Sequence, residues 1–80
     1  MSFLAIPTPY TKQENMFCKK KGSSIYSTIA KAIDACRNST DCKAVYDIDC
    51  DDDRYYLCPL DAAIKKSGKG SCVYSAGKYL

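Results

Sequence analysis

Six cysteines in a chain of 80 residues that contains no histidine constrain the fold more than any other feature. A chain of this length buries only a small core, and disulfides commonly supply the missing stability. No two cysteines stand in a Cys-x-x-Cys spacing, and no histidine is present to complete a zinc site. We therefore expect three disulfides and an oxidising compartment. The six cysteines are Cys18, Cys36, Cys42, Cys50, Cys58 and Cys72.

The charge balance is mildly basic, with 12 lysines and arginines, 9 aspartates and glutamates, and a net charge of +3. It carries no nucleic-acid signature, so we expect no nucleic-acid partner. No apolar run approaches the roughly 20 residues that span a bilayer. Residues 1–6 are too short for a signal peptide, so we expect a secreted, extracellular protein whose leader is missing from this sequence.

The length favours one domain, preceded by an arm. Pro7 and Pro9 fix an extended path, so residues 1–15 are expected to form an extended N-terminal arm or edge segment. Residues 16–80 are expected to form a single disulfide-rich module. Ser23 or Ser24 can cap a helix over residues 25–37. Its apolar positions recur at helical spacing at Ile25, Ile29, Ala32, Ile33 and Cys36.

Residues 42–50 change to a period of two, which predicts a strand with one buried side. Cys42, Ala44, Tyr46, Ile48 and Cys50 share the side expected to be buried, and Lys43, Val45, Asp47 and Asp49 share the other. We expect further short strands at residues 16–18, 55–58 and 71–75. Residues 60–66 are expected to form one or two helical turns.

The cysteines and their neighbours also form a longer pattern. It reads Ala32-x3-Cys36-x5-Cys42-Lys43-Ala44-Val45-Tyr46-Asp47, then Cys50, Tyr56-Leu57-Cys58 and Ser71-Cys72-Val73-Tyr74. This pattern resembles the PAN/apple-like modules of secreted and extracellular proteins. The resemblance implies an α+β fold, with one amphipathic helix packed on a small antiparallel sheet and stapled by disulfides. It also implies a module that binds a protein or a carbohydrate. The family commonly has two cysteines one turn apart on the helix, and Ala32 stands at the first of those positions here.

The same resemblance implies that the first and last cysteines, Cys18 and Cys72, pair. A bridge between Cys42 and Cys50 is disfavoured, because eight residues of extended strand separate their alpha carbons by about 26 Å and a disulfide needs about 7 Å. Two arrangements of the other four cysteines remain. We favour Cys36–Cys42 with Cys50–Cys58, and the alternative is Cys36–Cys50 with Cys42–Cys58.

Lysines and tyrosines are the candidate ligand-binding residues. A Cys18–Cys72 bridge would bring the two lysine-rich segments together as one basic face, and otherwise these lysines only solubilise the protein. Tyr46 and Tyr74 are expected in the core, and one of Tyr55 and Tyr56 must face outward if their strand alternates. The predicted ligand-binding set is Tyr55, Tyr56, Lys19, Lys20, Lys21, Lys65, Lys66 and Lys69.

The run Asp47-x-Asp49-x-Asp51-Asp52-Asp53 resembles the start of an EF-hand calcium loop. The pattern then fails, because Asp52 stands where the loop needs glycine and Cys58 stands where it needs glutamate. We expect a solvated acidic turn in preference to a weak cation site, and neither metal nor cofactor.

Catalysis is not expected. No histidine can act as a general base, the thiols are expected to be oxidised, and no serine or lysine lies in a nucleophile motif. The sequence predicts a secreted, non-enzymatic recognition module that binds an extracellular protein or glycan through a sheet face and adjoining loops. One alternative is a defensive or venom-type peptide acting on membranes or channels, with membrane contact less favoured. The other is an extracellular matrix or adhesive component.

Overall fold

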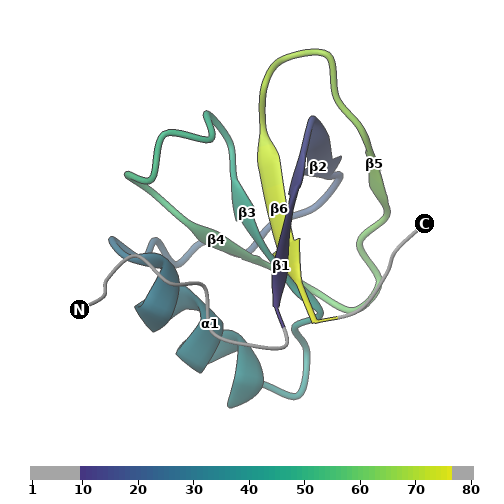
Figure 1. The fold of residues 1–80 in the computed structure, drawn as a ribbon. Helices are drawn as coiled ribbons and strands as arrows, with labels where there is room; N and C mark the ends of the chain where they lie inside the picture. The colour runs from purple at the N-terminus through teal and green to yellow at the C-terminus, as the bar shows by residue number, and fades with distance from the viewer. Residues whose placement is uncertain (1–9, 77–80) are drawn as a thin grey trace.

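The computed structural model describes residues 10–76, which form an α+β unit of one helix and two antiparallel sheets (Figure 1). The predicted disulfide-stapled α+β class is therefore confirmed. The elements are β1 (Thr11–Glu14), β2 (Met16–Cys18), α1 (Ile29–Arg37), β3 (Ala44–Asp47), β4 (Tyr56–Cys58), β5 (Ile64–Lys66) and β6 (Cys72–Ser75). Nothing helical in the described part of the chain has the length and apolar character needed to cross a membrane.

Four strands form the main sheet in the order β1-β6-β3-β4, and β2 pairs with β5 in a separate ribbon. The chain passes from the main sheet to the ribbon at Asn15, whose φ of 62° is a left-handed conformation that asparagine tolerates. The N–H groups of Asn15 and Met16 both donate to the Ser71 carbonyl, at 2.7 and 3.3 Å. The left-handed conformation at Asn15 therefore turns the chain so that β1 pairs in the main sheet and β2 pairs in the ribbon. Residues 1–9 of the predicted arm lie outside the described residues.

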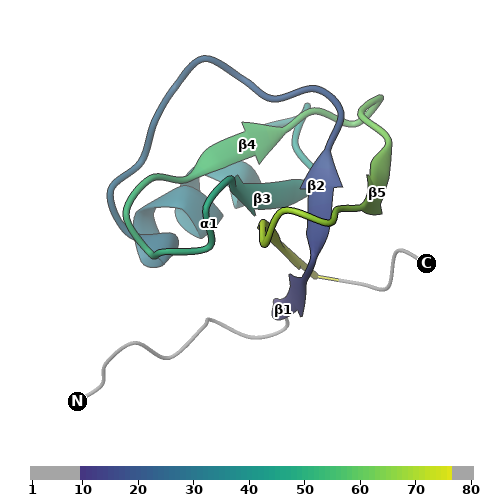
Figure 2. The same ribbon diagram turned by 90° about the horizontal axis from the view of Figure 1, so that it is seen from above.

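The helix and the ribbon cover opposite faces of the main sheet (Figure 2). On the helix side, Val45 and Tyr74 pack with Ile33 in one buried cluster. On the ribbon side, Ala44 and Val73 pack in a second cluster. Because successive strand residues point to opposite faces, β3 and β6 are buried on both sides. The open sheet face expected from the sequence is therefore covered at these two strands.

This two-sided burial corrects the predicted pattern for residues 42–50. Val45, expected on the exposed side, is fully buried beneath α1, and Asp47 is 1% exposed. Ile48, expected to be buried, is 36% exposed because β3 ends at Asp47. The period-two pattern located the strand correctly, but burial on both faces removed the contrast between its sides.

The helix begins four residues later than predicted and ends where predicted, at Arg37. Thr28 caps it, with its side-chain oxygen accepting the N–H of Lys31 at 3.2 Å. Ala32, Ile33 and Cys36 are buried as expected, whereas Ile25 is 56% exposed. The segment before the cap instead runs beside β4: the backbones of Tyr26 and Tyr55 exchange two hydrogen bonds of 2.9 Å.

The predicted helical turns over residues 60–66 are wrong, because Ile64–Lys66 is the strand β5. This strand pairs with β2, placing Lys66 opposite Met16 and Ile64 opposite Cys18. The pairing buries part of Ile64 against the ribbon-side cluster. Long-range pairing thus outweighs the local helix signals of this segment.

Three disulfides staple the fold: Cys18–Cys58, Cys36–Cys42 and Cys50–Cys72, with alpha carbons 6.2, 5.2 and 5.1 Å apart. The Cys36–Cys42 prediction is confirmed. The predicted Cys18–Cys72 and Cys50–Cys58 bridges are wrong, and so is the alternative arrangement. The reason is which face each cysteine occupies: Cys18 and Cys58 lie in the ribbon-side cluster, whereas Cys72 lies in the helix-side cluster.

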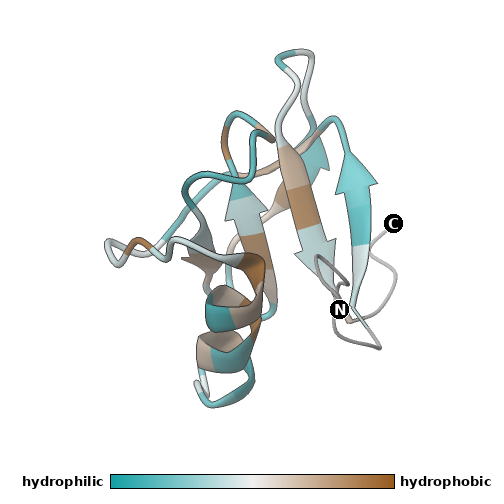
Figure 3. Cartoon of the chain, turned by 60° about the vertical axis from the view of Figure 1, so that its left-hand side comes forward, coloured by the Kyte–Doolittle hydropathy of each residue, from teal (hydrophilic) through white to brown (hydrophobic). Residues whose placement is uncertain are grey.

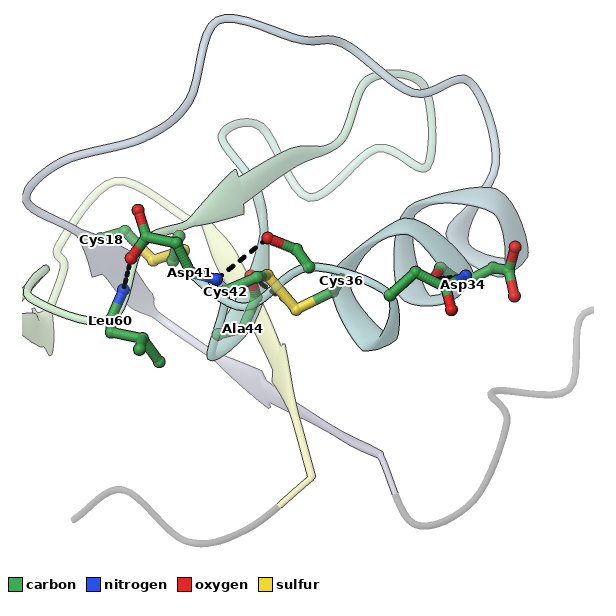
Figure 4. The surroundings of a disulfide bond; sticks show 10 residues. Cys18, Asp34, Cys36, Asp41, Cys42, Ala44 and Leu60 are labelled. Carbon is green, nitrogen blue, oxygen red and sulfur yellow. Dashed lines mark hydrogen bonds between the residues drawn. A yellow bond between two sulfur atoms is a disulfide. The ribbon is translucent and has the colours of Figure 1, made fainter.

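The Cys36–Cys42 bridge closes the turn between α1 and β3 (Figure 4). In this turn Asp41 accepts the backbone N–H of Leu60 through its side chain, at 3.0 Å. The backbone N–H of Asp41 donates to the Ser39 hydroxyl at 3.1 Å. The turn is therefore tied to the segment that follows β4 as well as to the helix.

Candidate functional site

A groove of about 420 Å³ lies beside the end of β3, on the side of the main sheet that the ribbon covers. This volume falls within the range of small-ligand sites. Tyr46 and Ile48 give the groove an apolar part, and Lys66 and Lys69 give it positive charge. Phe17, Ser67, Gly68 and Ser71 complete its lining.

The loop between β5 and β6 forms one wall of the groove and is held at both ends. The backbone N–H of Ser67 donates to the Asn15 carbonyl at 2.7 Å, and the Ser71 hydroxyl donates to the Met16 carbonyl at 2.5 Å. Within the loop, the N–H of Lys69 donates to the Ser67 hydroxyl at 3.0 Å. Gly70 has a φ of 82°, a conformation that favours glycine. These bonds fix the backbone that carries Lys69.

The groove presents positive charge beside neutral side chains. Lys66 and Lys69 are exposed, and neither forms an ion pair within residues 10–76. Partial burial raises the pKa of Tyr46 above its usual value, so its hydroxyl remains a neutral donor and acceptor at physiological pH. This combination can bind an anionic group on the lysines while an apolar surface packs on the tyrosine ring.

The two neighbouring tyrosines of the predicted binding set have different surroundings. Tyr55 is 2% exposed, and its hydroxyl donates to Asp52 Oδ1 at 2.9 Å. Its ring meets that of Tyr74 edge to face, with centroids 6.0 Å apart. Tyr56 is the half-buried, outward member of the pair, but Lys21 Nζ lies 4.6 Å from the centre of its ring. Tyr55 is therefore a core residue, and the Lys21 side chain covers one face of the Tyr56 ring.

The six lysines of the predicted binding set also differ in their surroundings, and two of them line the groove. Lys20 pairs with Asp61 at 2.6 Å, and Lys21 covers Tyr56. The Lys19 backbone N–H donates to the Ala63 carbonyl at 2.9 Å, and Lys65 lies opposite Phe17 in the ribbon. Only Lys66 and Lys69 line the groove. The two lysine-rich segments approach each other through the pairing of β2 with β5, and the expected Cys18–Cys72 bridge has no part in it.

The acidic run Asp47–Asp53, which starts at the last residue of β3, uses two of its carboxylates in hydrogen bonds within the protein. Asp47 Oδ2 accepts the backbone N–H of Asp52 at 3.0 Å, while Asp47 Oδ1 is buried and has no hydrogen-bond partner among residues 10–76. Burial raises the pKa of Asp47. Asp52 adopts a φ of 62° and accepts the hydroxyl of Tyr55. The expectation of a fully solvated turn is therefore wrong at Asp47.

The remaining aspartates of the turn, Asp49, Asp51 and Asp53, are exposed. Asp49 Oδ2 lies 4.0 Å from Arg54 Nη2. In the described part of the chain, no group of three or more cysteine, aspartate and glutamate side chains is placed to hold a metal ion. Among the described residues, the acidic turn is therefore not a candidate metal centre, and the groove remains the candidate site.

No protein-family model, curated protein or solved structure matches this chain. The groove and the disulfide framework are therefore the features from which a function can be inferred.

Six groove residues are absent from the predicted set: Phe17, Tyr46, Ile48, Ser67, Gly68 and Ser71. The sequence predicts Tyr46 in the core and Ile48 on a buried strand side, because its period-two pattern continues to residue 50. A usable signal was the unbroken apolar run Met16-Phe17-Cys18, which lacks the alternation of a strand with one solvated side. It indicates a strand with apolar contacts on both sides: Met16 packs against the ribbon-side cluster, and Phe17 lines the groove.

Proposed function

We propose that this protein is a secreted, non-enzymatic recognition module and that it binds an acidic extracellular glycan in the groove beside β3. The observation that carries the proposal is the placement of two lysines without ion-pair partners in residues 10–76 next to Tyr46 and Ile48. Sugar rings present apolar C–H faces that pack on tyrosine, and their acidic groups pair with ammonium groups. The Ser67 hydroxyl accepts the N–H of Lys69 and keeps its own proton to donate to a ligand.

The size of the groove favours a glycan over a protein as the ligand. About 420 Å³ accommodates a short oligosaccharide segment. A standard protein interface covers about 800 Å² on each partner, which would require the groove to be one part of a larger apolar surface. The exposed large apolar side chains among residues 10–76 are Ile25, Ile48 and Leu60, and only Ile48 lines the groove.

The disulfides support secretion, because three bridges in a small unit are typical of oxidising compartments. We also retain membership of the PAN/apple-like modules as a proposal. The helix packed on an antiparallel sheet supports it. The bridge of Cys18 to Cys58 departs from the pairing of first and last cysteines that this resemblance implies.

Calorimetric titration with sulfated, uronic-acid and neutral oligosaccharides of equal length tests the proposed function. We expect the acidic ligands to bind and the neutral one to bind much more weakly. Lys66→Gln and Lys69→Gln should each weaken binding by about tenfold or more, since charged hydrogen bonds contribute roughly 1.5 to 3 kcal/mol. Lys31→Gln removes the same charge from an exposed position on α1 and serves as the matched control.

Equal loss in Lys31→Gln and Lys66→Gln would show non-specific attraction and contradict the groove as the site. No binding of any acidic oligosaccharide at millimolar concentration would contradict a glycan ligand. Leakage of anionic vesicles at the same protein concentrations would favour the membrane-active alternative, and selective capture of a matrix protein would favour the adhesive one.

A further inference from the structure

The free side of β1 (Thr11–Glu14) is the feature that the groove leaves unexplained. This strand is at one end of the main sheet, and β6 is its only neighbour among the described strands. Figure 3 shows β1 as largely hydrophilic, and three of its four residues are exposed. The other end of the sheet is different, because the backbone N–H of Gly22 donates to the carbonyl of Leu57 in β4 and that of Tyr26 donates to the carbonyl of Tyr55, just before β4.

The backbone groups of Lys12 and Glu14 point away from β6. The N–H of Asn15 donates to Ser71, beyond the pair Glu14 and Cys72 in the β1–β6 register. The carbonyl of Glu14 belongs to the same trans peptide as that N–H and therefore points the opposite way, toward the outer edge. Antiparallel pairing alternates every second residue, so the backbone of Lys12 shares this outward direction.

We propose that β1 pairs with β1 of a second copy of this chain, in an antiparallel arrangement centred on Gln13. In this register Lys12 lies opposite Glu14 of the second copy, and Glu14 lies opposite its Lys12. The outward backbone groups of both residues then form the interchain hydrogen bonds. The result is one continuous eight-stranded sheet, formed from two four-stranded sheets.

Charge selects this register over its neighbours. A slip that keeps the hydrogen-bonding groups facing each other sets Lys12 opposite Lys12 of the second copy, or Glu14 opposite its Glu14. Parallel pairing in register also juxtaposes like charges, and directly opposed like charges destabilise a strand pair. A slip by one residue reverses the side-chain faces and loses the hydrogen bonds. Only the proposed register satisfies both the backbone and the charges.

The central residue is compatible with this pairing. Gln13 lies on the symmetry axis, opposite Gln13 of the second copy in a position where side chains are closest. Its Oε1 is buried and has no hydrogen-bond partner among residues 10–76, and pairing across the axis would give this oxygen a donor. Two glutamine amides facing each other can each donate to the other's oxygen.

Sedimentation equilibrium on the full chain up to millimolar concentration tests the proposal. The native chain should dimerise. Lys12→Glu alone and Glu14→Lys alone should each weaken the association by about tenfold or more, because each change converts two opposite-charge pairs into like-charge pairs. The double variant Lys12→Glu with Glu14→Lys restores both pairs and should dimerise like the native chain.

An equimolar mixture of the two single variants provides the sharpest comparison. Every cross-strand charge pair is again complementary in the mixed dimer, so the mixture should associate more tightly than either variant does alone. A native chain that stays monomeric at millimolar concentration would overturn the proposal. Single variants that dimerise like the native chain, or a mixture that fails to associate while both variants keep native circular dichroism, would also overturn it. None of these outcomes depends on the ligand of the groove.

Discussion

Removing the Cys18–Cys58 bridge should destabilise the protein more than removing the Cys36–Cys42 bridge. The first joins β2 of the ribbon to β4 of the main sheet across 40 residues, and the second closes a turn of 6 residues. The chain-entropy relation gives about 3.9 kcal/mol for the longer loop and about 2.2 kcal/mol for the shorter one. The 22-residue Cys50–Cys72 loop falls between them, at about 3.4 kcal/mol.

The expected differences are large relative to the total stability of such a chain. A unit of 80 residues has an unfolding free energy of about 4 to 12 kcal/mol. Loss of about 3.9 kcal/mol can therefore unfold much of the population at 37 °C. The two double variants should differ by about 1.7 kcal/mol, or roughly 7 to 14 °C in Tm.

Paired alanine variants and thermal denaturation followed by circular dichroism provide the assay. Peptide mapping of the native protein should first recover Cys18 linked to Cys58 and Cys50 linked to Cys72. A lower Tm for Cys36→Ala with Cys42→Ala than for Cys18→Ala with Cys58→Ala would refute the reasoning. A recovered peptide joining Cys18 to Cys72 would refute the topology itself.

Two further predictions concern the buried polar groups beside the acidic turn. Tyr55→Phe should lower the unfolding free energy measured in urea by about 1 to 2 kcal/mol, because it removes the hydrogen bond to Asp52. Tyr56→Phe should change the unfolding free energy by less than about 0.5 kcal/mol. Equal effects of the two substitutions would contradict this difference in burial. Burial holds the pKa of Asp47 above its unfolded value, so the contribution of Asp47 to stability falls as pH rises from the usual aspartate range through the folded pKa. Over that pH range the unfolding free energy of Asp47→Asn should therefore rise relative to that of the native protein. A difference in unfolding free energy that stays constant or moves the other way would contradict the shift.

The helix and the principal strands follow from local patterns that the sequence displays. Ala32, Ile33 and Cys36 recur at helical spacing and are buried together. The sequence predicts the helix start too early because Ser23 and Ser24 offer the same capping chemistry as Thr28, and Ile25 continues the apolar spacing. The pairing of Tyr26 with Tyr55 excludes a helix there, and no local signal encodes a contact between residues so far apart.

The disulfides and the groove depend on which face of the sheet each segment covers. The Cys36–Cys42 bridge spans a short turn and could be predicted locally, whereas the other two bridges depend on the layer order of ribbon, sheet and helix. Charge alone predicts Lys66 and Lys69 as binding residues. Their partnership with Tyr46 requires β5 to be a strand, which the helical signals of residues 60–66 concealed.

Amide chemical-shift mapping tests the central claim most directly. Isotopically labelled protein would be titrated with the acidic oligosaccharide that binds in calorimetry, at two salt concentrations. The largest shifts should fall at residues 46–48 and 66–71, with little change in α1, and the affinity should fall as salt screens the lysines. Shifts confined to α1, or to the surroundings of Tyr56 and Lys21, with residues 46–48 and 66–71 unchanged would contradict recognition in the groove.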